Sequence, residues 1–290
     1  MSATPAAPPS TPSAPAPPAP GADPRDQGRP VPFFRAARAV FDLSLEGMVW
    51  SRRSLLMILL LGLPAPLALL FRIFITRLPS RVGGFDFYGI VIAFYYVRNA
   101  LPLAALFYAT ALIADEVEGK TITYLLTRPI QRVSVLAGKF AAYLVTTLAL
   151  ALPAVVMTFF LLTTIRGWSG IGAHVPDLFR DMGVVALTLV TYGAFFTLMG
   201  VLLRRPVIPG LLFLFVWELL ANAPGYLPRF TITAYLRSLI HHRPPDEGMA
   251  EIFAQVLPAA LCLEAVGAMI VVFLAGAAWI FSTREYVLDQ

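Results

Sequence analysis

The chain has 290 residues, of which 58% are hydrophobic and only 13% are charged. A soluble domain carries roughly 25% charged residues, so this composition excludes an ordinary soluble protein and favours an integral membrane protein. The formal net charge of +5 fits the cations that orient membrane spans better than a nucleic-acid surface, and the single cysteine, Cys262, excludes an intrachain disulfide framework.

The first 32 residues form a separate compositional region. They hold 11 of the 25 prolines, together with Ala, Ser and Gly, and they contain almost no large apolar side chains. Such a segment cannot bury enough surface to offset its chain entropy. We expect a disordered, Pro/Ala-rich cytoplasmic tail over residues 1–32, followed by one membrane domain over residues 33–290.

The next segment, residues 33–50, has the periodicity of an amphipathic helix. Apolar residues recur at spacings of three and four, at Phe34, Ala37, Phe41, Leu45 and Met48, and charged residues recur in the same way on another face. Beside a membrane span, such a helix is predicted to lie flat in the interface. The alternative is a helix of a small soluble domain.

Six apolar runs follow, each near the roughly 20 residues that cross the hydrocarbon core. They cover residues 54–76, 87–114, 135–165, 182–203, 207–226 and 259–282. Prolines inside several runs are compatible with membrane helices, where neighbouring groups satisfy the freed carbonyls. The sequence therefore predicts an all-α, polytopic membrane protein with six transmembrane helices, and a short extra helix near residues 231–240.

The distribution of Lys and Arg predicts the orientation of the spans. The pairs Arg52-Arg53 and Arg204-Arg205 stand at span boundaries, and a majority of the cations fall on one side if the N-terminus is inside. We expect a multi-pass protein of the cell (inner or plasma) membrane with both termini in the cytoplasm. The segments 77–86, 166–180 and 227–258 are then predicted to lie on the outer side.

The polar segment 112–139, between the second and third runs, is the candidate functional site. Residues 114–121 read Ala-x-x-x-x-Gly-Lys-Thr, which is a relaxed match to a phosphate-binding loop. A phosphate cradle needs a preceding strand and a Gly-rich backbone, whereas here a membrane helix precedes the motif and three carboxylates would repel a triphosphate. We expect this chain to bind no nucleotide and no other cofactor, and not to be an enzyme.

The same segment fits a contact with another protein better. Residues 121–129 predict one or two helical turns with Ile122, Leu125 and Leu126 on one face, ended by Pro129. A short apolar face in water needs a partner to cover it. The alternative is an ordinary solvated connection.

The spacing of this segment resembles the signature of ABC-2 type transporter permeases. The matching pattern is Glu116-x-x-Gly119-x-Thr121-x-x-x-Leu125-Leu126-x-x-Pro129-x-x-Arg132-x-x-x-Leu136-x-Gly138-Lys139. The amphipathic helix and the six spans extend the resemblance over residues 33–290. Lys120, between the Gly and the Thr, departs from the pattern.

The resemblance implies a permease subunit of an ATP-driven ABC transporter that works as an exporter. It implies a short coupling helix, with Glu116, Gly119, Thr121, Ile122, Leu125, Leu126 and Pro129 contacting a separate cytoplasmic ABC ATPase that binds ATP and Mg. It also implies a second permease subunit in the bilayer, as a homodimer or a heterodimer. The alternative reading is a six-span secondary transporter or membrane-embedded enzyme without an ATPase partner.

Charged residues inside the predicted spans form a second candidate site. Arg98, Glu218 and Glu264 are costly in hydrocarbon. We hypothesise an intramembrane charge network in which Arg98 pairs with one of the two glutamates. The alternative is a glutamate that is neutral or reaches water.

Two adjacent histidines, His241 and His242, suggest a metal site only weakly. Adjacent side chains point apart, and the third histidine, His174, lies in another predicted loop. We therefore expect no metal site and a solvated loop at the histidine pair.

Overall fold

The computed structural model describes residues 32–49, 52–75, 84–118, 132–166, 171–203, 205–223, 225–242 and 257–283, and within these ranges it is helical without a strand. The predicted all-α class is confirmed for this part of the chain. Its elements are, in order, α1 (Phe33–Val49), α2 (Arg52–Gly62), α3 (Pro64–Ile75), α4 (Gly84–Ile90), η2 (Val91–Ala100), α5 (Leu101–Glu118), α7 (Arg132–Thr163), η3 (Thr164–Arg166), α8 (Ile171–Leu202), α9 (Val207–Leu212), η4 (Phe213–Trp217), η5 (Glu218–Asn222), η6 (Leu227–Phe230), α10 (Ile232–Ser238) and α12 (Ala259–Thr283).

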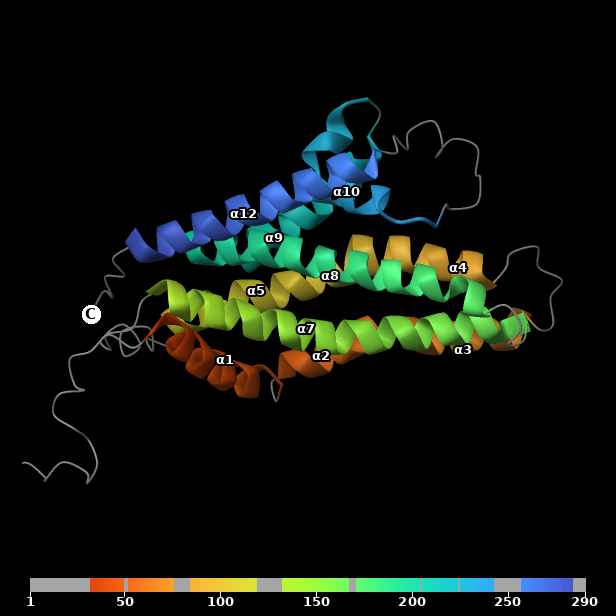
Figure 1. Ribbon diagram of the computed structural model, residues 1–290, viewed down its shortest axis with the longest axis horizontal. Helices are drawn as coiled ribbons and strands as arrows, with labels where there is room; N and C mark the ends of the chain where they lie inside the picture. Colours follow the sequence, from red (N-terminus) through yellow and green to blue (C-terminus); the bar gives the residue numbers. More distant parts are fainter. Residues whose placement is uncertain are drawn as a thin grey trace, which may run out of the picture.

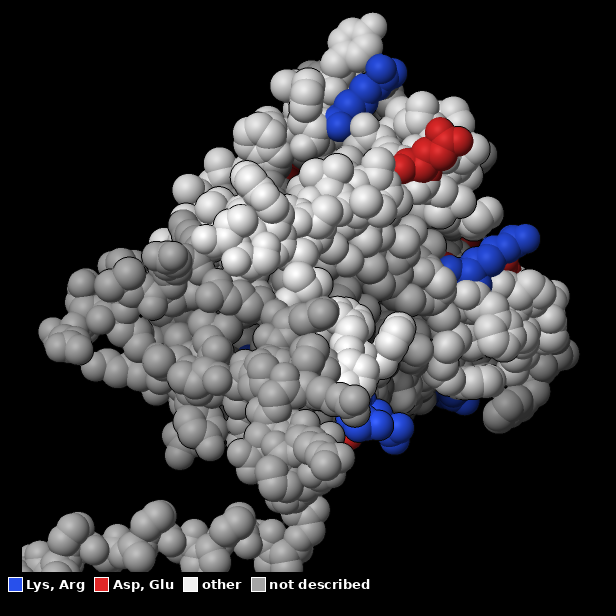
Figure 2. Space-filling model, turned by 60° about the vertical axis from the view of Figure 1, so that its left-hand side comes forward, with Lys and Arg blue, Asp and Glu red and all other residues white. Residues whose placement is uncertain are grey.

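The long helices run side by side as a bundle (Figure 1). α8 packs against α5, α7 and α12, and it is the most buried of the long apolar helices, whereas α12 is the least buried. The core therefore lies around α5 and α8, and α12 lies at the edge of the bundle. Figure 2 shows a largely uncharged surface among the described residues, as expected of a protein that faces lipid.

Five of the described helical segments are long and apolar enough to cross a membrane: Ser54–Ile73, Gly84–Leu112, Val133–Thr163, Ile171–Leu202 and Ala259–Thr283. They correspond to five of the six predicted runs. The remaining run, predicted over residues 207–226, folds as a shorter apolar helix, Val207–Asn222. It ends early because η5 has 3-10 geometry and the chain then turns, with Gly225 at a φ of 84°. The sixth crossing stays a prediction.

Helix α8 begins well before the run predicted from hydropathy. The sequence placed residues 166–180 in an outer connection and began the span at Met182, but the helix starts at Ile171. Charged residues lower the hydropathy of this first part of α8. Of these, Asp181 is buried inside the helix and lies against His242 of another part of the chain.

The second span is π-helical from Val91 to Ala100, immediately before Pro102. Proline has no backbone N–H and clashes with the carbonyl four residues earlier, which disturbs the regular α-helical ladder. The side-chain amide of Asn99 donates to the backbone oxygen of Phe94, so one carbonyl in this stretch gains a side-chain partner. Long π-helical stretches are rare, and π-bulges occur frequently at functional sites.

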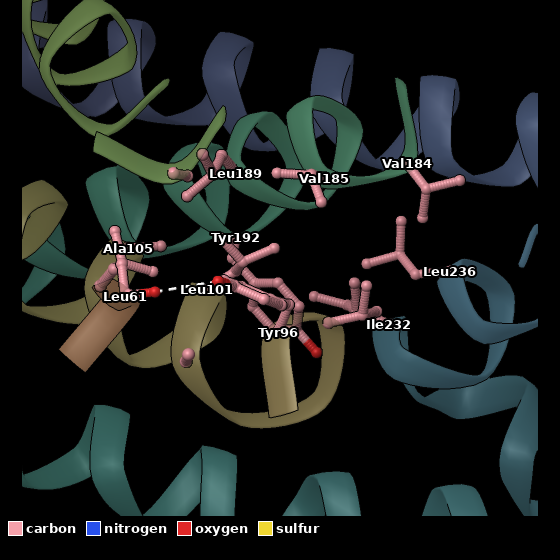
Figure 3. Close-up of a cluster of buried hydrophobic side chains, with 14 of the residues drawn as sticks. Leu61, Tyr96, Leu101, Ala105, Val184, Val185, Leu189, Tyr192, Ile232 and Leu236 are labelled. Atoms are coloured by element: carbon pink, nitrogen blue, oxygen red, sulfur yellow. Dashed lines mark hydrogen bonds between the residues drawn. The ribbon is translucent and has the colours of Figure 1, made fainter. Parts of the chain in front are cut away.

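Buried tyrosines connect the helices across the core. Tyr96 donates to the backbone oxygen of Leu61 at 3.0 Å, which is the bond drawn in Figure 3, and Tyr143 donates to the backbone oxygen of Leu189 at 2.8 Å. A buried phenol needs a hydrogen-bond partner, and here a helix carbonyl supplies it. In Figure 3, apolar side chains of α8 and α10 lie around Tyr96 and Tyr192.

Helix α1 matches the segment predicted to be an amphipathic helix. It packs against α7 and buries Ala36, whereas Phe34 and Leu43 remain exposed. Its position at a membrane surface stays a prediction. The tail over residues 1–32 lies outside the described residues except for Pro32.

Gly193 of α8 packs against the ring of Tyr143 in α7. A Cβ atom at this position would lie 2.3 Å from a ring carbon of Tyr143, so the ring would have to move and its hydrogen bond would be disturbed. We expect Gly193→Ala to lower the free energy of unfolding by about 1–3 kcal/mol. Thermal unfolding of the detergent-solubilised protein measures this change.

The matched control is Gly183→Ala on the same helix, where a Cβ atom would meet nothing within 4 Å. It should be neutral or slightly stabilising, because alanine favours a helix more than glycine does. Equal effects of the two substitutions would contradict the proposed packing.

Candidate functional site

The predicted coupling segment lies between two described helices. α5 ends at Glu118 and α7 begins at Arg132, so Gly119, Thr121, Ile122, Leu125, Leu126 and Pro129 lie outside the described residues. For Glu116 the structure gives the backbone, which belongs to the last turns of α5. The described part of the site is therefore the set of helices that hold the two ends of this segment.

Lys139, in the signature, joins α7 to α5. Its ammonium group donates to the backbone oxygen of Leu112 at 2.7 Å, and the side chain is buried. A buried lysine is costly without hydrogen-bond partners, and a backbone carbonyl of α5 supplies one here. This contact fixes the end of the second span to the start of the third.

Gly138, the preceding signature residue, allows α1 to approach α7 closely. A Cβ atom at Gly138 would lie 2.4 Å from the backbone oxygen of Ala37. Any larger residue would force α1 away from α7. The Gly-Lys pair of the signature therefore has a structural role that follows from its contacts: the glycine admits α1, and the lysine binds α5.

Helix α8 approaches α5 in the same region. A Cβ atom at Gly200 would lie 3.0 Å from the backbone oxygen of Thr110, so the two backbones are near contact distance. The two ends of segment 119–131 thus emerge from helices that are packed on α1 and α8.

Comparison with known proteins identifies the family. A family model described as ABC-2 family transporter protein matches residues 80–286. The chain belongs to the ABC-2 transporter family. Because the match covers the polar segment 112–139 and every described element from α4 to α12, the resemblance read from the signature is confirmed. A search among curated proteins gives no match.

Membership of the ABC-2 family indicates that the chain is a membrane component of a transporter. The family consists of membrane components of transporters that are generally not catalytic themselves and that associate in general with an ABC ATPase. Together with the five long apolar helices, this makes the chain a multi-pass membrane protein with a transport role.

The structure does not bring the three charged residues of the predicted network together. Arg98 donates to the side-chain oxygen of Asn222 at 3.1 Å, and Glu264 is exposed on α12. Glu218 is buried and accepts the backbone N–H groups of Ile232 and Thr233 at 3.2 and 3.1 Å. Among the described residues, Arg98 forms no ion pair with either glutamate, because backbone donors already occupy the Glu218 carboxylate.

His242 differs from the expectation of a solvated loop. Its Nε2 lies 2.8 Å from a carboxylate oxygen of Asp181, and both side chains are buried. His241 beside it is exposed, and His174 lies near Asp177. No group of three or more His, Cys, Asp or Glu residues in the described ranges is arranged to hold a metal ion.

The Asp181–His242 pair is the contact that sequence reasoning missed. The rings of Phe85 and Tyr88 lie against His242, and a Cβ atom at Gly89 would clash with it. The sequence signal was weak, because Asp181 resembles a loop residue when hydropathy alone is considered. Its partner is 61 positions away in the chain.

The role of Lys139 can be tested by removing its ammonium group. Lys139→Met keeps a long apolar side chain but loses the bond to the Leu112 carbonyl, so we expect a destabilisation of about 1.5–3 kcal/mol. Thermal unfolding in detergent measures it. Lys139→Arg retains a donor and should recover part of the loss, and a variant as stable as the original chain would rule out this role.

Glu218 and Glu264 provide a matched pair of carboxylates. Glu218→Ala removes two hydrogen bonds at the start of α10 and should lower the free energy of unfolding by at least about 2 kcal/mol. Glu264→Ala, on the exposed face of α12, should leave it unchanged. Chemical denaturation of both variants in the same detergent compares them, and equal losses would refute the assigned role of Glu218.

Proposed function

We propose that this chain is the transmembrane permease subunit of an ATP-driven ABC transporter, which exports its cargo and couples to a separate cytoplasmic ATPase through the segment after the second span. The observation that carries the proposal is the family match over residues 80–286, which contains the complete signature from Glu116 to Lys139. ATP and Mg would bind to the ATPase subunit.

The proposed mechanism uses residues 121–129 as the coupling helix. Ile122, Leu125 and Leu126 would fill an apolar groove of the ATPase, and Glu116 would pair with a basic group beside that groove. Hydrophobic anchors with a charged rim are a common arrangement at protein interfaces. Closure of the ATPase subunits on ATP would then move this helix.

The packed base of the segment supports this mechanism. The Lys139–Leu112 bond and the close approach of α1 at Gly138 tie α5, α7 and α1 together beside the proposed coupling helix. Movement of the coupling helix would therefore move whole helices. In the proposed assembly, two such permease subunits, identical or related, lie side by side in the inner or plasma membrane with their termini in the cytoplasm, and the cargo passes between them.

If residues 121–129 bind the ATPase as proposed, substitutions in and beside this segment should weaken the association of the chain with the ATPase. Leu125→Asp places a charge on the proposed apolar face, and Glu116→Lys reverses the proposed rim charge, so each should weaken the association by at least about tenfold, corresponding to 1.4 kcal/mol. Co-purification with an ABC ATPase subunit co-expressed with this chain, and transport-dependent ATP hydrolysis by the complex, measure the effect.

The control variant is Arg229→Gln, which changes an exposed side chain on η6, far along the chain from the coupling segment. It should retain both association and ATP hydrolysis. If the detergent-solubilised chain never associates with an ATPase, and Leu125→Asp leaves transport unchanged, the alternative of a secondary transporter or membrane-embedded enzyme replaces this proposal.

A further inference from the structure

Two arginines from different elements converge on one neutral side chain. Arg98 in η2 and Arg237 in α10 donate to the same oxygen atom of Asn222 in η5, at 3.1 and 3.0 Å. The two donating nitrogens therefore lie within about 6 Å of each other, a separation at which like charges repel appreciably near a protein surface.

No carboxylate compensates these two charges within the part of the chain that the structure describes. Asp177 and Asp181 contact His174, Arg180 and His242, and neither lies against Arg98 or Arg237. Glu218 lies in the same short element as Asn222, but it is occupied by the backbone amides of α10. An arginine side chain stays protonated at any physiological pH, so the repulsion cannot be relieved by losing a proton.

The surroundings of Arg237 show the same excess of positive charge. Burial, and then the neighbouring Arg98, lower the pKa of Arg237 from its ordinary value. The Arg237 guanidinium also lies 5.7 Å from the ring centroid of Phe94, whose negative face partly balances it. This ring contact is weaker than an ion pair and does not neutralise the Arg237 guanidinium.

The pair is accessible from the surface. Asn222 is exposed, and Arg98 and Arg237 are half-buried, so their stems are held by the fold while their polar groups can be reached. Exposed apolar residues adjoin them, including Phe94 in η2 and Leu219 in η5. An anion bound here would have an apolar surface beside it.

We propose that Arg98, Arg237 and Asn222 form a binding site for a phosphate group carried by the headgroup of a membrane phospholipid. Guanidinium groups match the geometry of phosphate oxygens and bind them with charge-assisted hydrogen bonds. The exposed apolar residues beside the pair fit acyl chains. The site is separate from the coupling segment, and its test needs no ATPase.

The test uses the purified full-length chain in detergent micelles. Thermal unfolding is followed with increasing amounts of three probes: phosphatidylglycerol, diacylglycerol with the same acyl chains, and inorganic phosphate. Native mass spectrometry counts the bound lipid. We expect phosphatidylglycerol to raise the unfolding temperature and diacylglycerol to have little effect, because only the first carries a phosphate.

Substitutions then locate the effect. Arg98→Gln and Arg237→Gln should each require at least about tenfold more phosphatidylglycerol for the same shift. Arg229→Gln is the matched control, because Arg229 is a nearby exposed arginine that contacts Tyr226 and makes no bond to Asn222 in the structure. This control should respond to phosphatidylglycerol as the original chain does.

A second variant keeps the test decisive if the arginine variants do not fold. Asn222→Asp has nearly the same shape and places a carboxylate between the two guanidiniums. We expect it to raise the unfolding temperature without lipid and to abolish the shift caused by phosphatidylglycerol, because the anion site is then filled from within.

The outcomes separate the sources of the anion. If inorganic phosphate alone gives the full shift with the same dependence on both arginines, the site stands and its ligand is free phosphate. Equal shifts with diacylglycerol and phosphatidylglycerol would overturn the proposal. A phosphatidylglycerol shift that survives in Asn222→Asp and in either arginine variant would also overturn it.

Discussion

Inside a lipid bilayer, each backbone amide and carbonyl must find its hydrogen-bond partner within the protein, and the rest of this structure depends on that constraint. Helices meet it locally. Where Pro102 interrupts the second span, the chain becomes π-helical and Asn99 supplies a donor to the Phe94 carbonyl. Several buried hydroxyls find partners in the same way, as when Tyr143 donates to the Leu189 carbonyl of a neighbouring helix. Polar side chains in the core thereby connect helices instead of destabilising them.

Because lipid tails are as apolar as the side chains, helices in a membrane associate through close packing more than through hydrophobic burial. Glycines at three contacts permit this packing: Gly138 toward α1, Gly193 toward Tyr143, and Gly200 toward α5. Two of these contacts, at Gly138 and Gly200, involve the helices that flank segment 119–131. The ABC-2 signature thus contains, beside its proposed contact with an ATPase, residues that hold the membrane helices in place.

The buried acidic residues Glu218 and Asp181 bind groups other than arginine. Two arginines, Arg98 and Arg237, are therefore left without an acidic partner among the described residues. Glu218 binds backbone amides, and Asp181 binds His242. Arg98 and Arg237 consequently share the neutral Asn222. A charge arrangement of this kind is stable when an external anion completes it, which connects the local packing of η5 and α10 with the chemistry of the surrounding membrane.

The sequence by itself determined the helical class, the short helix near residues 231–240, the ABC-2 signature and five of the six spans it predicted, because hydropathy and motif spacing are properties of consecutive residues. Only the tertiary structure decided which groups bind the charged side chains. Hydropathy began the fourth span at Met182, yet α8 starts at Ile171, and Asp181 within it is buried against His242, which lies 61 positions away in the chain. The expected pairing of Arg98 with a glutamate failed for the same physical reason: the free energy of a buried charge depends on its partner in space, and a linear pattern does not contain that partner.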